Sequence, residues 1–212
     1  MKTSISLFFL ISILLIACNS KNANHKSSQL QSSNSFNNKV KHSLFNSKAT
    51  LYLDTIYERL NVNELVEVAK QQPKTSFINR IFNKDRLKLA QSLGAQYFVF
   101  IDTSTYSNIL HFERLNKMMP ISREAASIIG GLFKKEIQNT DPSALVSVRR
   151  AKFGSAKTFQ YGYYQMMSES PELETFSNHF AISSSKGSYI LYNISLDDLD
   201  LLYLKKQLIF NE

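Results

Sequence analysis

The pattern of apolar and polar residues divides the chain into three parts. Residues 5–16 are almost continuously apolar, whereas residues 19–43 are rich in Asn, Ser, Lys and Gln and contain three large apolar side chains. From about residue 44 onward, apolar residues recur at the spacings of helices and strands. A length of 212 residues suits one domain better than two. We therefore predict a single folded domain over residues 44–212.

Within this domain, the periodicity predicts helices first and strands afterwards. Residues 49–94 are interpreted as helical, with Asn63 as the N-cap of one helix and Gly94 at the C-cap of another. Residues 95–101 and 108–115 alternate in the manner of strands and are separated by a turn-rich segment. We predict that these two segments form a β-hairpin.

The second half of the domain is predicted to contain two helices and four strands. Ser122 is expected to cap a helix that runs to about residue 139, in which Gly130 and Gly131 indicate a close approach to the sheet. A final helix is expected to begin at Ser195. The remaining segments are predicted strands, at 144–152, 157–167, 175–183 and 188–194. This order indicates an α+β domain, with an antiparallel β-sheet of about six strands and helices packed on it.

The N-terminus has the features of a secretion signal. Lys2 supplies a positive charge, and the apolar run 5–16 is shorter than the roughly 20 residues that span a bilayer. The run ends in Leu15-Ile16-Ala17-Cys18, which resembles the lipobox of bacterial lipoproteins. This resemblance implies that residues 1–17 are removed and that the thiol of Cys18 is acylated. The alternatives are an ordinary cleaved signal peptide with an incidental cysteine, and an uncleaved anchor.

An acylated Cys18 would fix the protein to a lipid bilayer, because each buried methylene contributes about 0.8 kcal/mol. Residues 18–43 bury too little apolar surface to offset their ordering entropy, so we predict a disordered tether. As a coil, such a segment reaches roughly 28 Å on average and about 85 Å when extended. Asn19 follows the cysteine where an Asp retains many Gram-negative lipoproteins at the inner membrane. The expected location is therefore the cell envelope, at the outer rather than the inner membrane.

The net charge of +8 is concentrated before the predicted domain. Six lysines precede Asp54, the first acidic residue, and the remaining 19 Lys and Arg are nearly balanced by 17 Asp and Glu. A nucleic-acid-binding domain carries its basic excess on its own surface. We therefore expect no nucleic-acid partner.

The candidate catalytic and metal-binding residues are few. Cys18 is the single cysteine, so neither an internal disulfide nor a cysteine zinc site is expected. His111 and Glu113 would share one strand face and could serve acid–base chemistry or hold a metal, but without a third partner we interpret them as a solvated face. His179 is expected to be half exposed. We predict no catalytic residue, no metal site and no cofactor. Three acidic residues near the last helix are interpreted as caps: Asp197, Asp198 and Asp200.

Tyrosines provide the candidate binding surface. Tyr161 and Tyr163 are expected on one face of a strand, with Tyr189 and Tyr192 on a neighbouring strand. Tyrosine is enriched at recognition surfaces, although it is also common at the edge of a sheet that helices cover. The adjacent residues Arg149 and Arg150 are expected to point to opposite faces, which argues against a paired role.

From about residue 96 to residue 210, the order of elements resembles that of the PsbP-like superfamily, named for an extrinsic subunit of photosystem II. The resemblance implies a hairpin, a helix, antiparallel strands and a closing helix, together with functions in binding and assembly rather than a defined activity. The segments that carry it are QYFVFI, NILHFERL, SREAASIIGGLFKKEI, FQYGYYQM and HFAISSSKGSYILYNI.

Three functions are compatible with these features. The first is a non-enzymatic envelope lipoprotein that binds a protein partner or supports an assembly. The second is a lipoprotein that binds a small molecule or lipid in a pocket between helix and sheet. The third and least favoured is an enzyme with a site around His111 and Glu113. The sequence therefore predicts an anchored binding module.

Overall fold

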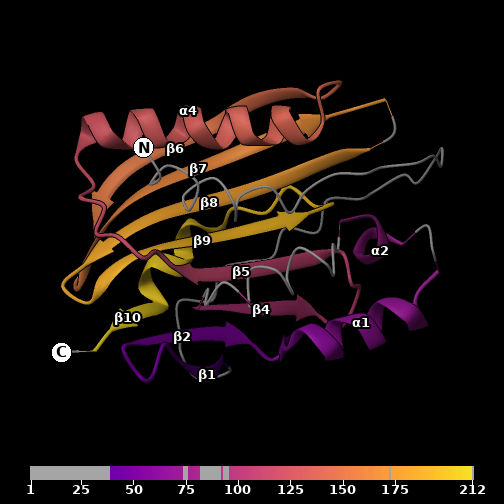
Figure 1. The fold of residues 1–212 in the computed structure, drawn as a ribbon, viewed down its shortest axis with the longest axis horizontal. Helices are drawn as coiled ribbons and strands as arrows, with labels where there is room; N and C mark the ends of the chain where they lie inside the picture. Colours follow the sequence, from indigo (N-terminus) through magenta and orange to yellow (C-terminus); the bar gives the residue numbers. More distant parts are fainter. Residues whose placement is uncertain (1–38, 74–75, 82–91, 93–95, 172, 212) are drawn as a thin grey trace.

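The computed structural model describes residues 39–73, 76–81, 92, 96–171 and 173–211 (Figure 1). The predicted signal peptide, Cys18 and the tether up to residue 38 lie outside the described residues, as does Gly94. No helix in the described part of the chain is long and apolar enough to span a membrane.

The described strands form two antiparallel sheets. The large sheet has the order β3 (Tyr57–Leu60), β4 (Gln96–Asp102), β5 (Asn108–Arg114), β9 (Gly187–Ser195), β8 (Glu174–Ser184), β7 (Phe159–Glu169) and β6 (Leu145–Ser155). The small sheet has the order β1 (Lys39–Leu44), β2 (Ala49–Asp54) and β10 (Leu208–Phe210). The described helices are α1 (Val62–Gln71), α2 (Phe77–Ile81), α4 (Arg123–Thr140) and the 3-10 helix η2 (Leu201–Lys206).

The two faces of the large sheet are covered by different elements. On one face, which we call the helix face, α4 lies along β6 and β7 and α1 packs near β3 and β4 (Figure 1). The opposite face, which we call the small-sheet face, packs against β1, β2, β10 and η2. Because both faces are covered, polar residues of the central strands are also buried. The prediction of an α+β domain with an antiparallel sheet is confirmed, with seven strands in the large sheet rather than about six.

The first part of the domain differs from the prediction. Residues 49–54 and 57–60 form strands instead of helix. In β2, the buried Leu51 and Leu53 alternate with the half-buried Tyr52 and Asp54, which is the period of a strand. Residues 39–43, which we assigned to the tether, belong to β1 and pair with β2. The N-cap of α1 is Asn61 rather than Asn63.

The final element also differs from the prediction. Instead of a long helix that begins at Ser195, the chain forms the six-residue η2, whose N-cap Asp200 accepts a hydrogen bond from the Leu202 amide at 2.9 Å. The three-residue strand β10 follows and pairs with β2. The apolar residues of this segment thus cover the small-sheet face through two short elements.

Helix α4 begins and packs as predicted. Ser122 caps it by accepting a hydrogen bond from the Ala125 amide at 3.1 Å. Gly130 lies directly over the ring of Tyr164 on β7, and a Cβ atom added there would be 2.5 Å from Tyr164 Cε1. The ring is held in place because its hydroxyl donates to the carbonyl of Ala126. Gly130 therefore allows the close approach of helix and sheet that the sequence indicated.

We expect opposite effects from alanine at the two adjacent glycines of α4. Gly130→Ala should lower the free energy of unfolding by about 1–3 kcal/mol, because the added methyl overlaps the fixed ring of Tyr164. Gly131→Ala should raise it by about 0.5–1 kcal/mol, because its Cβ would have no neighbour within 4 Å and alanine favours the helix. Urea unfolding measures both; equal effects would contradict the close contact.

Candidate binding groove

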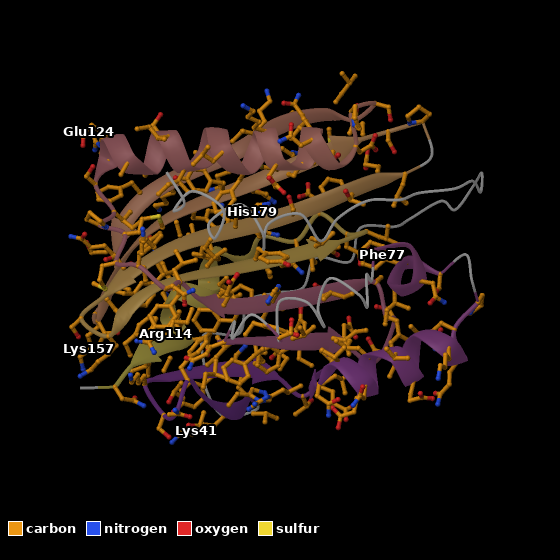
Figure 2. The ribbon with its side chains drawn as sticks, viewed as in Figure 1. Lys41, Phe77, Arg114, Glu124, Lys157 and His179 are labelled. Carbon is orange, nitrogen blue, oxygen red and sulfur yellow. The ribbon has the colours of Figure 1, made fainter. Side chains whose placement is uncertain are left out.

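A groove of about 820 Å³ lies at one end of the molecule, between the β6–β7 turn and the C-terminal elements. Figure 2 shows Lys157 at this end, on the side where Figure 1 places β10. One wall is formed by Ser155 and the turn residues that follow it, and the other by the end of η2 and by β10. The lining residues are Ser155, Ala156, Lys157, Thr158, Lys205, Lys206, Leu208, Ile209, Phe210 and Asn211.

The walls are joined by hydrogen bonds that the local sequence supplies. The amide of Phe210 donates to Thr158 Oγ1 at 3.1 Å, which ties β10 to the β6–β7 turn. Asn211 Nδ2 donates to the carbonyl of Ser47 at 2.6 Å, and the Asn211 amide donates to the carbonyl of Lys48 at 3.0 Å. These bonds fix the C-terminal segment on the small sheet, so the groove is built on rigid elements.

The charged residues of the groove lining are three lysines: Lys157, Lys205 and Lys206. Lys205 Nζ donates to the hydroxyl of Tyr161 at 3.2 Å and lies 5.6 Å from the centre of the same ring. The apolar part of the lining comes mainly from β10, where Ile209 is partly exposed. A lining that combines lysines with apolar side chains suits a ligand or partner segment that joins negative charge to an apolar body.

The four predicted tyrosines are buried and do not form an exposed surface. Tyr161, Tyr163 and Tyr189 lie on the small-sheet face with relative exposures of 2%, 0% and 0%, whereas Tyr192 lies on the helix face at 7%. The physical reason is that the small sheet and η2 cover a face we treated as open. Two of them contact residues that line the groove: Tyr161 contacts Lys205, and the ring of Tyr189 lies 4.7 Å from that of Phe210.

Tyr163 belongs to a chain of buried hydrogen bonds that crosses the large sheet. Its hydroxyl donates to Asn178 Oδ1 at 2.6 Å, and Asn178 Nδ2 donates to Asn193 Oδ1 at 3.2 Å. Asn193 Nδ2 donates to Asn108 Oδ1, and Asn108 Nδ2 donates to the hydroxyl of Tyr57. Burial and the neighbouring carboxylate of Asp200 raise the pKa of Tyr163. We call this set, Tyr57, Asn108, Asn193, Asn178 and Tyr163, the amide chain.

An ion pair links the amide chain to the edge strand β6. Tyr163 also hydrogen-bonds Asp200 Oδ1 at 3.0 Å, and Asp200 pairs with Arg150. Arg149 pairs with Asp198 at 3.3 Å. Both arginines reach the same side because a β-bulge interrupts the register between Val148 and Arg150. Our expectation that they point to opposite faces is therefore wrong.

The histidines of the helix face are also buried, contrary to the solvated face we predicted. His111 Nδ1 lies 2.5 Å from the hydroxyl of Tyr192, and the ring of His179 stacks on Phe133 at 4.6 Å, below α4 (Figure 2). Burial lowers the pKa of both His111 and His179 to about 3 and raises the pKa of Glu113 to about 8. His111 and Glu113 share a face as predicted, but their burial reflects cover on both sides of the sheet.

Metal ligands do not gather in the described part of the chain: no three His, Cys, Asp or Glu side chains there lie close enough to hold an ion. We did not identify the groove lysines from the sequence because Lys157 and Lys205 are far apart along the chain. The pair Lys205-Lys206 after a Leu-rich segment was a visible signal, but only the fold places it opposite the β6–β7 turn.

The architecture can be compared with solved structures. The solution structure of the cyanobacterial PsbP protein (CyanoP) from Synechocystis sp. PCC 6803 matches with a TM-score of 0.53, covering 87% of this chain and 100% of that chain. The fold is PsbP-like. At 10% sequence identity, the likeness concerns the arrangement of elements in space. No protein-family model and no curated protein matches the sequence.

Proposed function

We propose that this chain is a lipid-anchored lipoprotein of the bacterial cell envelope whose PsbP-like domain is a non-enzymatic binding or assembly module. The observation that carries the binding role is the groove, which three lysines and the apolar residues of β10 line at one end of the molecule. The lipobox-like residues Leu15 to Cys18 support the anchor. The segment between Cys18 and β1 has about 20 residues, which extend to at most roughly 70 Å.

The groove suits an acidic segment of a partner protein. Lysine charges in the lining steer a negatively charged partner and set its orientation, while the apolar lining residues contribute the area that excludes water. The described residues around Lys157 place no carboxylate in an ion pair with it, so its charge is available. The outer membrane is the proposed location, on the basis of Asn19.

One experiment tests the anchor and the groove together. The chain is expressed in a Gram-negative host, and membrane and soluble fractions are crosslinked and captured. The wild type should appear in the membrane fraction, and Cys18→Ser should appear in the soluble fraction because it has no thiol to acylate. Lys157→Glu should stay in the membrane but recover about tenfold less of an acidic partner, equivalent to about 1.4 kcal/mol.

The matched control is Lys41→Glu, the same charge reversal on an exposed lysine of β1 that does not line the groove (Figure 2). It should leave both localisation and capture unchanged. Membrane retention of Cys18→Ser would refute the acylated anchor. If Lys157→Glu and Lys41→Glu lost capture of the partner equally, the lysines would act through the net charge of the domain and not through the groove.

A second function, binding of a small molecule or lipid, is favoured by the size of the groove. Its volume of about 820 Å³ lies within the range of roughly 300–1,000 Å³ that holds small ligands. A fatty acid or acidic lipid headgroup would place its negative charge at the lysines and its chain on Ile209. Native mass spectrometry of the purified protein distinguishes this function, because a retained ligand would add a defined mass that Lys157→Glu removes. The third hypothesis, an enzyme, loses support because His111 and Glu113 are buried.

A further inference from the structure

The outer edge of the large sheet at β6 is long and has no neighbouring strand among the described residues. β6 contains 11 residues and is the last strand in the order of the large sheet. Nearly all of its residues are exposed. By contrast, the opposite edge strand β3 has only four residues. A long edge presents a row of backbone amide and carbonyl groups that a strand from another chain can pair with.

The ladder between β6 and β7 shows which amides of β6 are free. The Ala156 amide donates to the carbonyl of Phe159 at 2.8 Å, and the register is regular from Arg150 to Ser155. Because antiparallel residues alternate between bonded and non-bonded pairs, Lys152 and Gly154 bond inward. The amides of Ala151, Phe153 and Ser155 therefore point outward, away from β7.

The side chains of β6 differ in character between the two faces of the sheet. Val148 and Phe153 lie on the helix face, opposite Met166 and Gly162, and are exposed by 46% and 37%. Arg150 and Lys152 lie on the other face, opposite Gln165 and Tyr163. An added strand would thus meet apolar side chains on one face and basic side chains on the other. Since side chains alternate along a strand, the complementary partner alternates apolar and acidic residues.

The charge of the edge also excludes other occupants. Residues 145–157 contain no acid, and Asp198 and Asp200 already pair with Arg149 and Arg150, so a second copy of β6 would bring no carboxylate to Lys152 and would oppose like charges there. The chain before Asp54 carries no acidic residue, so it cannot supply the acidic strand either. Because Ser155 both ends β6 and lines the groove, a strand on this edge would lead to the groove lysines.

We infer that β6 is a strand-addition site for an extended segment of a partner protein in which apolar and acidic residues alternate. This inference rests on the proposed binding function and names the chemistry of the partner. The backbone groups of β6 supply the hydrogen bonds, and its two faces supply the selectivity. The edge disfavours neutral and basic strands because they offer no acidic partner to Lys152, the cationic side chain of β6 that is not paired with Asp198 or Asp200.

The test uses synthetic peptides and the full-length chain in detergent. The probe is an 11-residue fluorescent peptide of alternating valine and glutamate, matched to the length of β6. Two control peptides replace glutamate by lysine or carry N-methyl groups at alternate amides. Fluorescence anisotropy should show binding of the valine–glutamate peptide and at least about tenfold weaker binding of both controls. The N-methylated peptide keeps every charge, so its loss of affinity isolates the backbone contribution.

Protein variants locate the site. Ala151→Pro should weaken binding at least about tenfold, because it removes an outward amide without breaking a bond to β7. Ala151→Thr, which keeps the amide, is the matched control and should bind as the wild type does. Lys152→Glu should favour the valine–lysine peptide. Circular dichroism and the urea midpoint establish that each variant is folded.

Several outcomes would overturn strand addition. These are equal binding of the N-methylated peptide, unchanged binding by Ala151→Pro, or no binding of the valine–glutamate peptide. Partner capture separates this failure from failure of the proposed function. If Ala151→Pro captures the partner as well as the wild type does, β6 is not the site but the binding role stands. If no form captures a partner, the binding role itself fails.

Discussion

Replacing Asn193 by alanine should destabilise the domain by roughly 3–5 kcal/mol, because two buried groups lose their partner and a cavity is left. Asn193 has a relative exposure of 0% and lies at the centre of the amide chain. Its Nδ2 donates to Asn108 Oδ1 and to the carbonyl of Ile109 at 3.2 Å, and its Oδ1 accepts from Asn178 Nδ2 at 3.2 Å. The loss is a large part of the roughly 5–15 kcal/mol that stabilises a typical domain.

The amide chain allows a sharper comparison than a single variant. Asn193→Leu keeps most of the volume but leaves Asn108 and Asn178 unsatisfied, so it should cost nearly as much as alanine. Gln160→Ala, at an exposed position of β7, should change the free energy of unfolding by less than about 0.5 kcal/mol. Urea unfolding at constant pH measures all three. An Asn193→Leu protein as stable as the wild type would mean that the amide chain contributes no net stability.

The strands of the second half and α4 could be predicted because their local signals agree with the fold. Ser122 caps α4, Gly130 marks the helix–sheet contact, and residues 185 and 186 form the turn between β8 and β9. Strong alternation and turn residues are local properties that neighbours along the chain reveal. The resemblance to PsbP-like proteins rested on the same elements, and the solved CyanoP structure supports that fold.

The small sheet could not be predicted because its strands depend on distant partners. We interpreted residues 39–43 as part of a polar tether, yet they pair with β2, whose other side pairs with β10 near the C-terminus. Because we did not predict this small sheet, we placed the tyrosines beneath it on an exposed surface. The predictions for His111 and His179 failed for the same reason. We assumed that a polar residue on a strand faces water, but both faces of this sheet are packed.

The combined contribution of His111, His179 and Glu113 to the stability of the domain should reach a maximum near pH 6.5 and fall on both sides. Burial lowers the pKa of His111 and His179 from 6.5 to about 3, so both are neutral in the native state over this range. Unfolded chains bind these protons first as the pH falls below 6.5. The stability that the two neutral histidines contribute is therefore complete above that pH and declines toward pH 3. The slope from both histidines approaches about 2.7 kcal/mol per pH unit.

Glu113 acts in the opposite direction. Burial raises its pKa from 4.5 to about 8, so the native state keeps the proton that the unfolded chain releases. Its contribution is complete below pH 4.5 and is lost as the pH rises to about 8, with a slope of up to about 1.4 kcal/mol per unit. The opposing slopes cancel where each unfolded histidine is half protonated, which places the maximum near pH 6.5.

Substitutions show which residue causes the loss of stability on each side of the pH profile. Urea unfolding is measured from pH 4 to pH 8 for the wild type, His111→Gln, His179→Leu and Glu113→Gln. Each histidine variant should remove half of the acid-side slope that His111 and His179 supply together, whereas Glu113→Gln should flatten the alkaline side and leave the acid decline steeper. Because these differences are taken against the wild type at each pH, the other carboxylates cancel. An acid slope unchanged in both histidine variants would mean that burial holds neither ring neutral in the native state.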